Sequence, residues 1–260
     1  IMAKSVSVMK GVWIGEEFEG RNTPSFPFKR VRETKQEVNI APMIVEPLES
    51  LRNAPDYASP LVFMVWPPHK NLVGEHDTLL NVLSVQSDTA KREGVEYHQW
   101  LRAGPRKNIK FDIKKVVAAV VACGGLCPGL NNVIRETVTT LKRTYGVETV
   151  YGIPYGYKGF YSHEWRKMEI SCVRDIHKTG GTILGTSRGG FDLNRIMDSI
   201  VSHGVNQLYL IGGSGTCRGA GLLHQEAIRR GYLLTVACVP KTIENDVAFI
   251  DRSFGFDSVV

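Results

Sequence analysis

The feature that most constrains the fold is an alternation of segments that begins near Lys115. From there on, short apolar runs rich in β-branched residues alternate with amphipathic segments, and each run ends at a glycine-rich loop. The runs are KKVVAAVVAC (114–123), ETVYGIP (148–154), GGTILGT (180–186), NQLYLI (206–211) and LLTVACVP (233–240). They are apolar throughout, as expected of strands that are covered on both faces. The pattern predicts an α/β fold, a Rossmann-like parallel sheet with helices on both faces.

Two of the intervening segments carry clear helix signals. In NNVIRETVTTLKRTYG (131–146), an apolar face formed by Val133, Ile134, Val138 and Leu141 precedes a natural stop at Gly146. The segment DLNRIMDSIVSHG (192–204) begins at Asp192, a good N-cap, and ends at Gly204. Both are predicted to be helices that cover the sheet.

The first 110 residues have a different texture. Prolines recur, charges of both signs are mixed, and little periodicity is present. The apolar pieces PLVFMVW (60–66) and TLLNVLSV (78–85) are too short to distinguish a strand from a helical turn. We therefore expect residues 1–110 to form an irregular N-terminal extension and residues 111–260 to form the α/β domain.

Composition narrows the class of partner. The net charge of +6 is modest and the basic residues are spread among carboxylates, which favours anionic small molecules and argues against nucleic acid. The longest apolar stretch, 116–123, is far shorter than the roughly 20 residues of a membrane-spanning helix. Five cysteines occur singly, without CxxC pairs, so we expect reduced thiols packed as small hydrophobes, with neither disulfides nor zinc.

Four loops are predicted to lie at the carboxyl edge of the sheet, where ligands bind in folds of this class. They are CGGLCPGLNN (123–132), GTSRGGFD (185–192), IGGSGTCRG (211–219) and VPKTIEND (239–246). Glycine lets backbone N–H groups approach an anion closely, and a helix N-terminus adds partial positive charge. With Arg188 and Lys241 beside these glycines, the loops predict a phosphate site. A P-loop signature is absent from the sequence, and GSGTCRG misses the GxGxxG spacing by one residue.

The amino-acid sequences of these loops, and their order along the chain, identify a family resemblance. From about residue 101 on, the chain resembles the N-terminal half of the ATP-dependent 6-phosphofructokinases, and the plant-type branch in particular. The phrases that carry the resemblance are ACGGLCPGLNNVIR, GYKGFY, IHKTGGTILGTSRGG, LYLIGGSGT, VPKTIEND and DRSFGFD, in that order.

The resemblance implies ATP-dependent phosphorylation of fructose 6-phosphate to fructose 1,6-bisphosphate, with Mg²⁺. It implies a nucleotide site formed by Gly125, Arg188, Gly189, Gly213, Ser214, Gly215 and Thr216. Gly215 is the ATP-type choice at the position that separates ATP users from pyrophosphate users. The implied substrate site is Lys241, Thr242, Ile243, Glu244 and Asp246. In it, Thr242 binds the sugar phosphate and Glu244 is the catalytic base.

Two residues depart from the family pattern. Ser214 stands where the family has the aspartate that supports Mg²⁺, and a neutral hydroxyl is a weaker partner for that cation. Glu244 stands where the base is normally aspartate and is one methylene longer. The family also continues beyond the position of Val260 with a half that supplies most of the sugar-phosphate contacts, so we expect this chain alone to bind nucleotide at best.

Three functions remain as alternatives. The first is an ATP-dependent phosphofructokinase; the second is a catalytically impaired subunit of that type with a binding or scaffold role. The third, a nucleotide-binding oxidoreductase, needs an acidic ribose ligand at a strand end, which Glu226 and its helix do not supply. The family resemblance further implies a homo- or hetero-oligomer located in the cytoplasm or the plastid stroma.

Overall fold

The computed structural model describes residues 55–63, 72–74, 77–80, 99–101, 104–245 and 253–259. The chain divides into two compact units, which are described separately. In the smaller unit, strand β2 (Thr78–Leu80) pairs antiparallel with β3 (Gln99–Leu101). All other described residues belong to the larger unit. The two ambiguous apolar pieces are a 3-10 turn, η2 (Pro60–Phe63), and strand β2, and the remainder of each lies outside the described residues.

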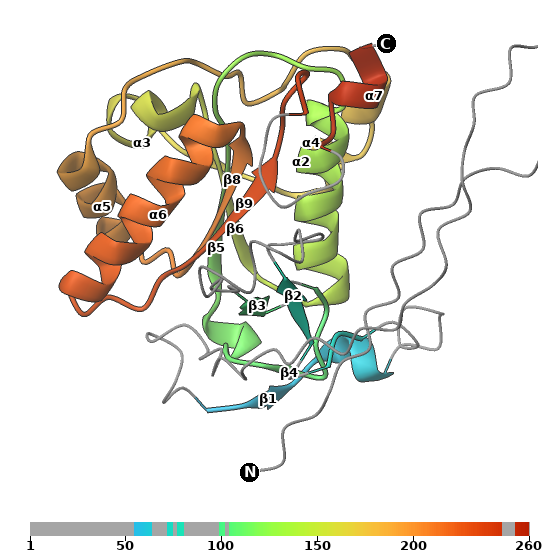
Figure 1. Cartoon of the computed structure of the whole chain (residues 1–260), viewed down its shortest axis with the longest axis vertical. Helices are drawn as coiled ribbons and strands as arrows, with labels where there is room; N and C mark the ends of the chain where they lie inside the picture. The colour runs from blue at the N-terminus through green and yellow to red at the C-terminus, as the bar shows by residue number, and fades with distance from the viewer. Residues whose placement is uncertain are drawn as a thin grey trace, which may run out of the picture. The chain divides into compact units, whose positions relative to one another are not determined.

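The larger unit is built on a five-stranded sheet (Figure 1). Its strands, in spatial order, are β7 (Arg166–Lys167), β6 (Thr149–Ile153), β5 (Val117–Ala122), β8 (Gln207–Gly212) and β9 (Thr235–Pro240). The last four are mutually parallel, and β7 runs antiparallel to β6. Four of the five predicted strands are therefore confirmed, and with them the α/β fold.

The predicted strand over 180–186 is wrong. That segment is a chain of turns in which Gly181 and Gly185 have φ of +74° and +65°, a left-handed conformation that a continuous strand does not contain. The edge strand of the sheet is instead β7, which consists of two exposed charged residues. The sequence has no apolar run there that would predict a strand. Short, charged edge strands are a common way to end a sheet without inviting further strands to pair.

Helices cover both faces of the sheet, as predicted. They are α2 (Leu130–Thr139), α3 (Gly159–Ser162), α4 (Ile170–Val173), α5 (Leu193–Ser202), α6 (Ser214–Arg229) and α7 (Phe256–Val259). The connecting segments hold the short elements β1 (Tyr57–Ala58), β4 (Asn108–Ile109), η4 (Ile113–Lys115), η5 (Thr140–Thr144), η6 (Gly156–Lys158) and η7 (Ile176–Lys178). None of the helices in these described ranges has the length and apolar character needed to cross a bilayer.

The predicted helix boundaries hold closely. The Asp192 carboxylate accepts the Arg195 N–H at 3.1 Å and caps α5, which ends just before Gly204 at φ +65°. Helix α2 continues as the π-helical turn η5, and Gly146 at φ +75° follows that turn. On the predicted apolar face, Val133 is only half-buried.

The core consists of two clusters on opposite faces of the sheet, and β5 supplies both. Ala119 and Val121 face the cluster under α3, α5 and α6, whereas Ala118 and Val120 face the cluster under α2 and α4 (Figure 1). This alternation is the period-two pattern of a strand that is buried on both faces. The glycine-rich loops that follow β5, β8 and β9 therefore extend from the carboxyl ends of well-packed strands.

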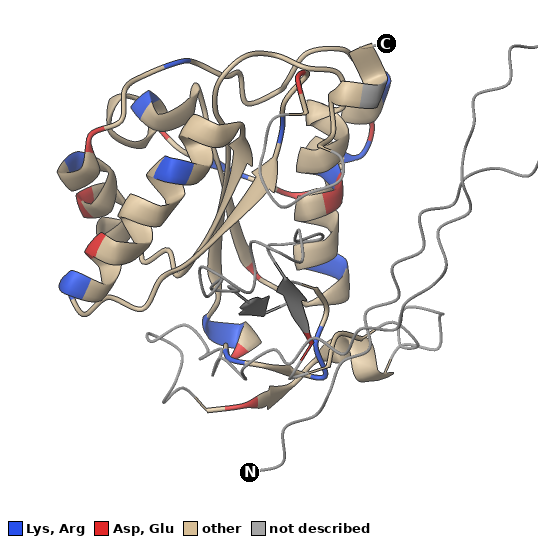
Figure 2. Cartoon of the chain, viewed as in Figure 1, with Lys and Arg blue, Asp and Glu red and all other residues tan. Residues whose placement is uncertain are grey.

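The distribution of charged side chains agrees with the expectation from the sequence, whereas the burial of the cysteines agrees only in part. Lys and Arg are interspersed with Asp and Glu over the larger unit (Figure 2). Cys123 and Cys127 are buried as expected, but Cys172 is exposed, and Cys217 and Cys238 are partly exposed. The expectation that all five are buried hydrophobes is therefore wrong for three of them.

Candidate functional site

The four loops line one cavity of about 610 Å³ at the carboxyl ends of β5, β8 and β9. Eleven of the twelve predicted site residues line it, and the twelfth, Asp246, lies outside the described residues. The eleven are Gly125, Arg188, Gly189, Gly213, Ser214, Gly215, Thr216, Lys241, Thr242, Ile243 and Glu244. The sheet topology thus brings together residues that are up to 119 positions apart in the sequence.

The loop between β8 and α6 presents the start of a helix to the cavity. Gly213 caps α6 without a side chain, and its carbonyl accepts the N–H groups of Thr216 and Cys217, each at 3.0 Å. Ser214 and Gly215 begin the helix and are exposed. First-turn N–H groups of a helix lack intrahelical acceptors and carry partial positive charge, so this surface favours an anion.

Lys241 ties the first loop to the fourth. Its side chain is buried, and Nζ donates a hydrogen bond to the Gly125 carbonyl. Its backbone N–H donates to the Gly212 carbonyl at 2.9 Å, which anchors the loop after β9 to the end of β8. Burial lowers the pKa of Lys241, and the nearby positive charge of Arg188 lowers it further. An anion in the cavity would offset both effects.

Arg188 reaches the cavity from the second loop. A Cβ placed on Gly125 would lie 3.4 Å from Nη2 of Arg188, so the glycine leaves room for the guanidinium. The second loop is held to the first by two hydrogen bonds: the Gly124 N–H donates to the Ser187 carbonyl, and the Thr186 hydroxyl donates to the Gly124 carbonyl, both at 2.9 Å. The exposed guanidinium is thus carried on a loop that is itself fixed.

The fourth loop holds an internally hydrogen-bonded pair. The Thr242 hydroxyl donates to Glu244 Oε2 at 2.6 Å and accepts the Glu244 N–H at 3.0 Å. Asn245 follows with a left-handed φ of +54°, and its Oδ1 accepts the Ser253 N–H at 2.8 Å. Ser253 in turn donates its hydroxyl to the Thr242 carbonyl at 3.0 Å. The Glu244 carboxylate is therefore oriented at the rim by its own loop.

The described residues offer a Mg²⁺ ion a single carboxylate in this cavity. Glu244 is the one carboxylate among the described residues that line the cavity. Where the chain is described, no group of three or more His, Cys, Asp or Glu side chains could hold a metal. Mg²⁺ is ordinarily bound through one or two carboxylates together with substrate phosphates, and Ser214 offers a neutral hydroxyl where a carboxylate is expected.

Sequence reasoning assigned no role to the aromatic pair in the wall of this cavity. The Tyr157 hydroxyl donates to the Thr216 carbonyl at 2.9 Å, and the ring meets Phe191 edge-on with centroids 4.9 Å apart. Tyr157 therefore links η6 to the first turn of α6. The signal was present in the phrase GYKGFY, where a tyrosine follows a glycine with φ of +66°.

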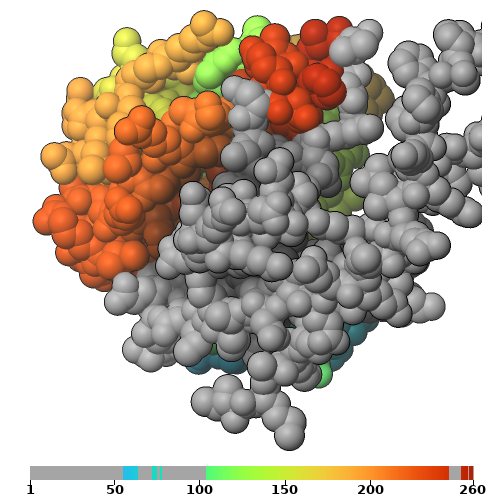
Figure 3. Space-filling model, viewed as in Figure 1, coloured from blue at the N-terminus to red at the C-terminus, as the bar shows by residue number. Residues whose placement is uncertain are grey.

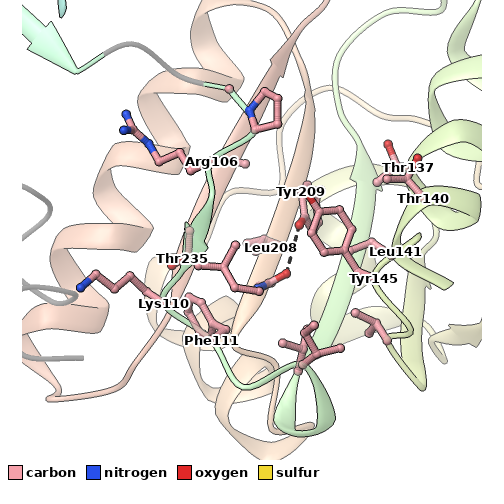
Figure 4. A pocket seen from close by; sticks show the side chains of 18 of the residues that line it. Arg106, Lys110, Phe111, Thr137, Thr140, Leu141, Tyr145, Leu208, Tyr209 and Thr235 are labelled. Atoms are coloured by element: carbon pink, nitrogen blue, oxygen red, sulfur yellow. Dashed lines mark hydrogen bonds between the residues drawn. The ribbon is translucent and has the colours of Figure 1, made fainter. Parts of the chain in front are cut away.

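A second cavity, of about 740 Å³, lies between α2 and the face of β8 and β9 (Figure 4). Phe111, Leu141, Tyr145 and Tyr209 contribute to a mainly apolar lining, and the Tyr209 hydroxyl donates to Gln207 Oε1 at 3.0 Å. The apolar part of this lining suits an apolar group, and Arg106 and Lys110 also line the cavity.

Comparison with known proteins identifies the family of this chain. The family model described as "Phosphofructokinase" matches residues 117–260, more than half of the chain. ATP-dependent 6-phosphofructokinase 7 of Arabidopsis thaliana is 49% identical over 183 residues, which cover 68% of this chain and 38% of the relative. The chloroplastic ATP-dependent 6-phosphofructokinase 4 of the same plant is 47% identical over 191 residues, covering 74% and 35%.

A solved structure agrees in fold. The pyrophosphate-dependent phosphofructokinase of Marinobacter aquaeolei superposes with a TM-score of 0.51 at 24% identity, covering 54% of this chain and 37% of that protein. The chain spans about two fifths of the length of the curated relatives it matches. From the family match and these identities, the chain belongs to the phosphofructokinase family.

Proposed function

We propose that the loop cavity binds the phosphates of ATP, and that the whole protein transfers a phosphoryl group from ATP to fructose 6-phosphate. The observation that carries the proposal is the convergence of three features on one cavity: the start of α6, the Arg188 guanidinium and the Lys241 ammonium. The names of the Arabidopsis relatives support ATP as the donor.

Each of the three features has a separate task. The first-turn N–H groups of α6 receive phosphate oxygens, and Arg188 presents a fork of donors that matches phosphate geometry. Lys241 adds charge near the transferring group. No atom lies within 4 Å of a Cβ placed on Gly215, so the space beside the first turn stays open for the nucleotide.

The fourth loop supplies the acceptor side of the proposal. Glu244 takes the proton from the 1-hydroxyl of the sugar, and Thr242 binds the sugar phosphate. The hydrogen bond from the Thr242 hydroxyl holds Glu244 Oε2 in place and supports this assignment. Because Glu244 is the one carboxylate in the described lining, we assign most of the metal's ligands to the phosphates of the nucleotide that brings it.

A second function is favoured by the same residues that depart from the family pattern. A neutral Ser214 and a longer Glu244 are compatible with a subunit that binds nucleotide without catalysing transfer. Phosphoryl transfer depends on placement, and a misplacement of about 1 Å can cost roughly a hundredfold in rate.

Calorimetric titration of the chain with ATP tests the binding step. Arg188→Ala should weaken ATP binding by about 10- to 100-fold, because charge-assisted hydrogen bonds contribute about 1.5–3 kcal/mol. The matched control is Arg174→Ala, which removes an exposed arginine that pairs with Asp175 outside the cavity lining. Equal affinities for the two variants would contradict the assignment of the phosphate site.

A coupled assay with ATP, Mg²⁺ and fructose 6-phosphate separates the two functions. Turnover by the whole protein supports the kinase, and retained ATP binding without turnover supports the noncatalytic subunit. We further propose an oligomer in the cytosol or the plastid stroma, the latter supported by the chloroplastic relative.

A further inference from the structure

Two cysteines that are far apart in the sequence meet beside the phosphate site. Cys217 lies in the first turn of α6 and Cys238 lies in β9, and their sulfur atoms are 2.7 Å apart. This separation is shorter than the about 3.5–4.0 Å of ordinary non-bonded contacts between carbon atoms. It approaches the ~2.05 Å of a disulfide bond.

The two cysteines differ in exposure from the cysteines of the first loop. Cys217 and Cys238 are each partly exposed, in contrast to Cys123 and Cys127, which are buried. Helix α6 forms part of the surface seen in Figure 3. Cys217 directly follows Thr216, the last residue of the segment Gly213–Thr216, which is called the phosphate loop from here on.

We propose that Cys217 and Cys238 form a reversible disulfide when the protein meets a peroxide, and that this modification site adjoins the nucleotide site. The disulfide would join the first turn of α6 to β9, the two elements from which the phosphate loop and the Lys241–Glu244 loop extend. This goes against the expectation from sequence that all the cysteines are inert.

The step balances with hydrogen peroxide as oxidant. The Cys217 thiolate attacks one peroxide oxygen, the O–O bond breaks, and a sulfenic acid and hydroxide form. The Cys238 sulfur then attacks the Cys217 sulfur, the S–O bond breaks, and the S–S bond forms as the oxygen leaves as water. Two thiols and one peroxide give one disulfide and two waters. A dithiol reductant reverses the reaction by exchange through a mixed disulfide.

The geometry also assigns the order of reaction. The hydrogen bond from the Cys238 thiol, together with a backbone hydrogen bond, lowers the pKa of Cys217 to about 7 despite partial burial, whereas the pKa of Cys238 is raised. Thiolates, not thiols, are the nucleophiles, so Cys217 attacks the peroxide and Cys238 resolves the product.

Peptide mapping after peroxide treatment tests the proposal. The folded chain is exposed to one equivalent of hydrogen peroxide, alkylated and digested with trypsin. The expected product is a cross-link between peptides 196–218 and 231–241, which dithiothreitol removes. Cys172, exposed and alone in peptide 168–174, is the internal control and should show no intramolecular link. If Cys172 is alkylated as expected but no link between Cys217 and Cys238 is found, the proposal is overturned.

Two variants test the order of reaction. In Cys238→Ser, the sulfenic acid on Cys217 should persist and react with dimedone, while in Cys217→Ser, Cys238 should remain unlabelled at the same dose. The reverse pattern would contradict the assignment, with circular dichroism confirming that both variants are folded.

A final arm rests on the proposed function. ATP at a concentration that just saturates the wild type should slow formation of the 217–238 link at least threefold in the wild type and have a smaller effect in Arg188→Ala, which binds ATP more weakly. If the link forms but ATP does not slow it, the disulfide site stands and the location of the nucleotide fails. If ATP binds but no link forms, the disulfide proposal fails alone.

Discussion

At the scale of single residues, the side chain at position 214 affects how strongly the cavity binds a divalent cation. Its hydroxyl lies at the first position of α6, exposed and facing the space where phosphate is proposed to bind. A carboxylate there would interact favourably with the helix N-terminus and with Mg²⁺, but would repel a metal-free triphosphate.

Ser214→Asp should therefore act in opposite directions with and without magnesium. Without Mg²⁺, ATP affinity should fall about five- to tenfold, which corresponds to about 1 kcal/mol of like-charge repulsion. With Mg²⁺, affinity should rise above that of the wild type. Ser171→Asp, which adds the same charge at an exposed position outside the cavity lining, should change neither value. Titrations with ATP in EDTA and in MgCl₂ measure both affinities. If Ser214→Asp changed the ATP affinity in the same direction under both conditions, the argument would be contradicted.

At the scale of elements, α6 carries three glycines, and two of them, Gly219 and Gly221, have contrasting surroundings. A Cβ placed on Gly219 would lie 3.0 Å from Tyr157 Cζ and 3.1 Å from Phe191 Cε2, whereas one on Gly221 would meet nothing within 4 Å. The first glycine lets the Tyr157 ring pack against the helix, and the second only weakens helix propensity.

Alanine at these two positions should move stability in opposite directions. Gly219→Ala should lower the free energy of unfolding by about 1–3 kcal/mol through overpacking and should disturb the Tyr157 hydrogen bond to Thr216. Gly221→Ala should raise it by about 0.5–1 kcal/mol. Chemical denaturation of both variants gives the comparison, and a loss of stability in Gly221→Ala would show that open space alone does not decide the outcome.

The same helix is tied to α5 by a charged network. Glu226 accepts from Arg229 at 2.6 and 2.7 Å and from Arg230 at 2.6 Å, and Arg230 also donates to Asp198 of α5 at 2.6 Å. The hydrogen bonds from Arg229 and Arg230 lower the pKa of Glu226 to about 2. The ionised carboxylate therefore favours the folded state.

This network predicts a pH dependence with a definite sign. Because the folded pKa lies below the usual 4.5, the contribution of Glu226 is complete above about pH 4.5 and disappears as pH falls to about 2. Glu226→Gln should lower Tm at pH 7, and the difference from wild type should shrink below pH 4.5. Glu164→Gln, at an exposed position, is the control for the loss of one charge. A difference in Tm that stayed constant down to pH 2 would contradict the linkage.

An element could be predicted from the sequence when the residues that determine it lie within or next to that element. Helix α5 could be predicted because Asp192, its apolar face and Gly204 are all local signals. Strands β5, β6, β8 and β9 could be predicted because each is a largely apolar run, although β9 is only half-buried. The error at 180–186 arose because Ile183 and Leu184 are apolar for packing against the α2 cluster and not as part of a strand. Strand β7 exists through pairing with β6, which no local pattern shows.

The site was predictable in its loops but not in its contacts. Glycine and basic residues indicate anion binding, and the family resemblance assigned positions within each loop. The hydrogen bonds from Lys241 to Gly125 and from Tyr157 to Thr216 join segments 116 and 59 residues apart, and such pairings follow from topology. The contact between Cys217 and Cys238 could not be predicted from their spacing for the same reason.

At the scale of the larger unit, both core clusters depend on one central strand. Ile134→Ala, in the α2 cluster, should lower the free energy of unfolding by about 2–5 kcal/mol. Because β5 joins the two clusters, amide protection should fall equally in α2 and in α5 on the opposite face. Hydrogen exchange would reveal separate layers if α5 kept its protection while α2 lost it, and the single cooperative unit would then be wrong.

The placement of the loops above this shared core has an evolutionary consequence. Ser214 and Glu244 are exposed at the cavity, and neither contributes to the buried clusters beneath it. Mutation at these positions therefore leaves the packing of both buried clusters unchanged. A lineage can change or abandon its reaction at this rim in single steps while inheriting an intact scaffold, which makes the architecture a ready source of paralogues with divergent roles.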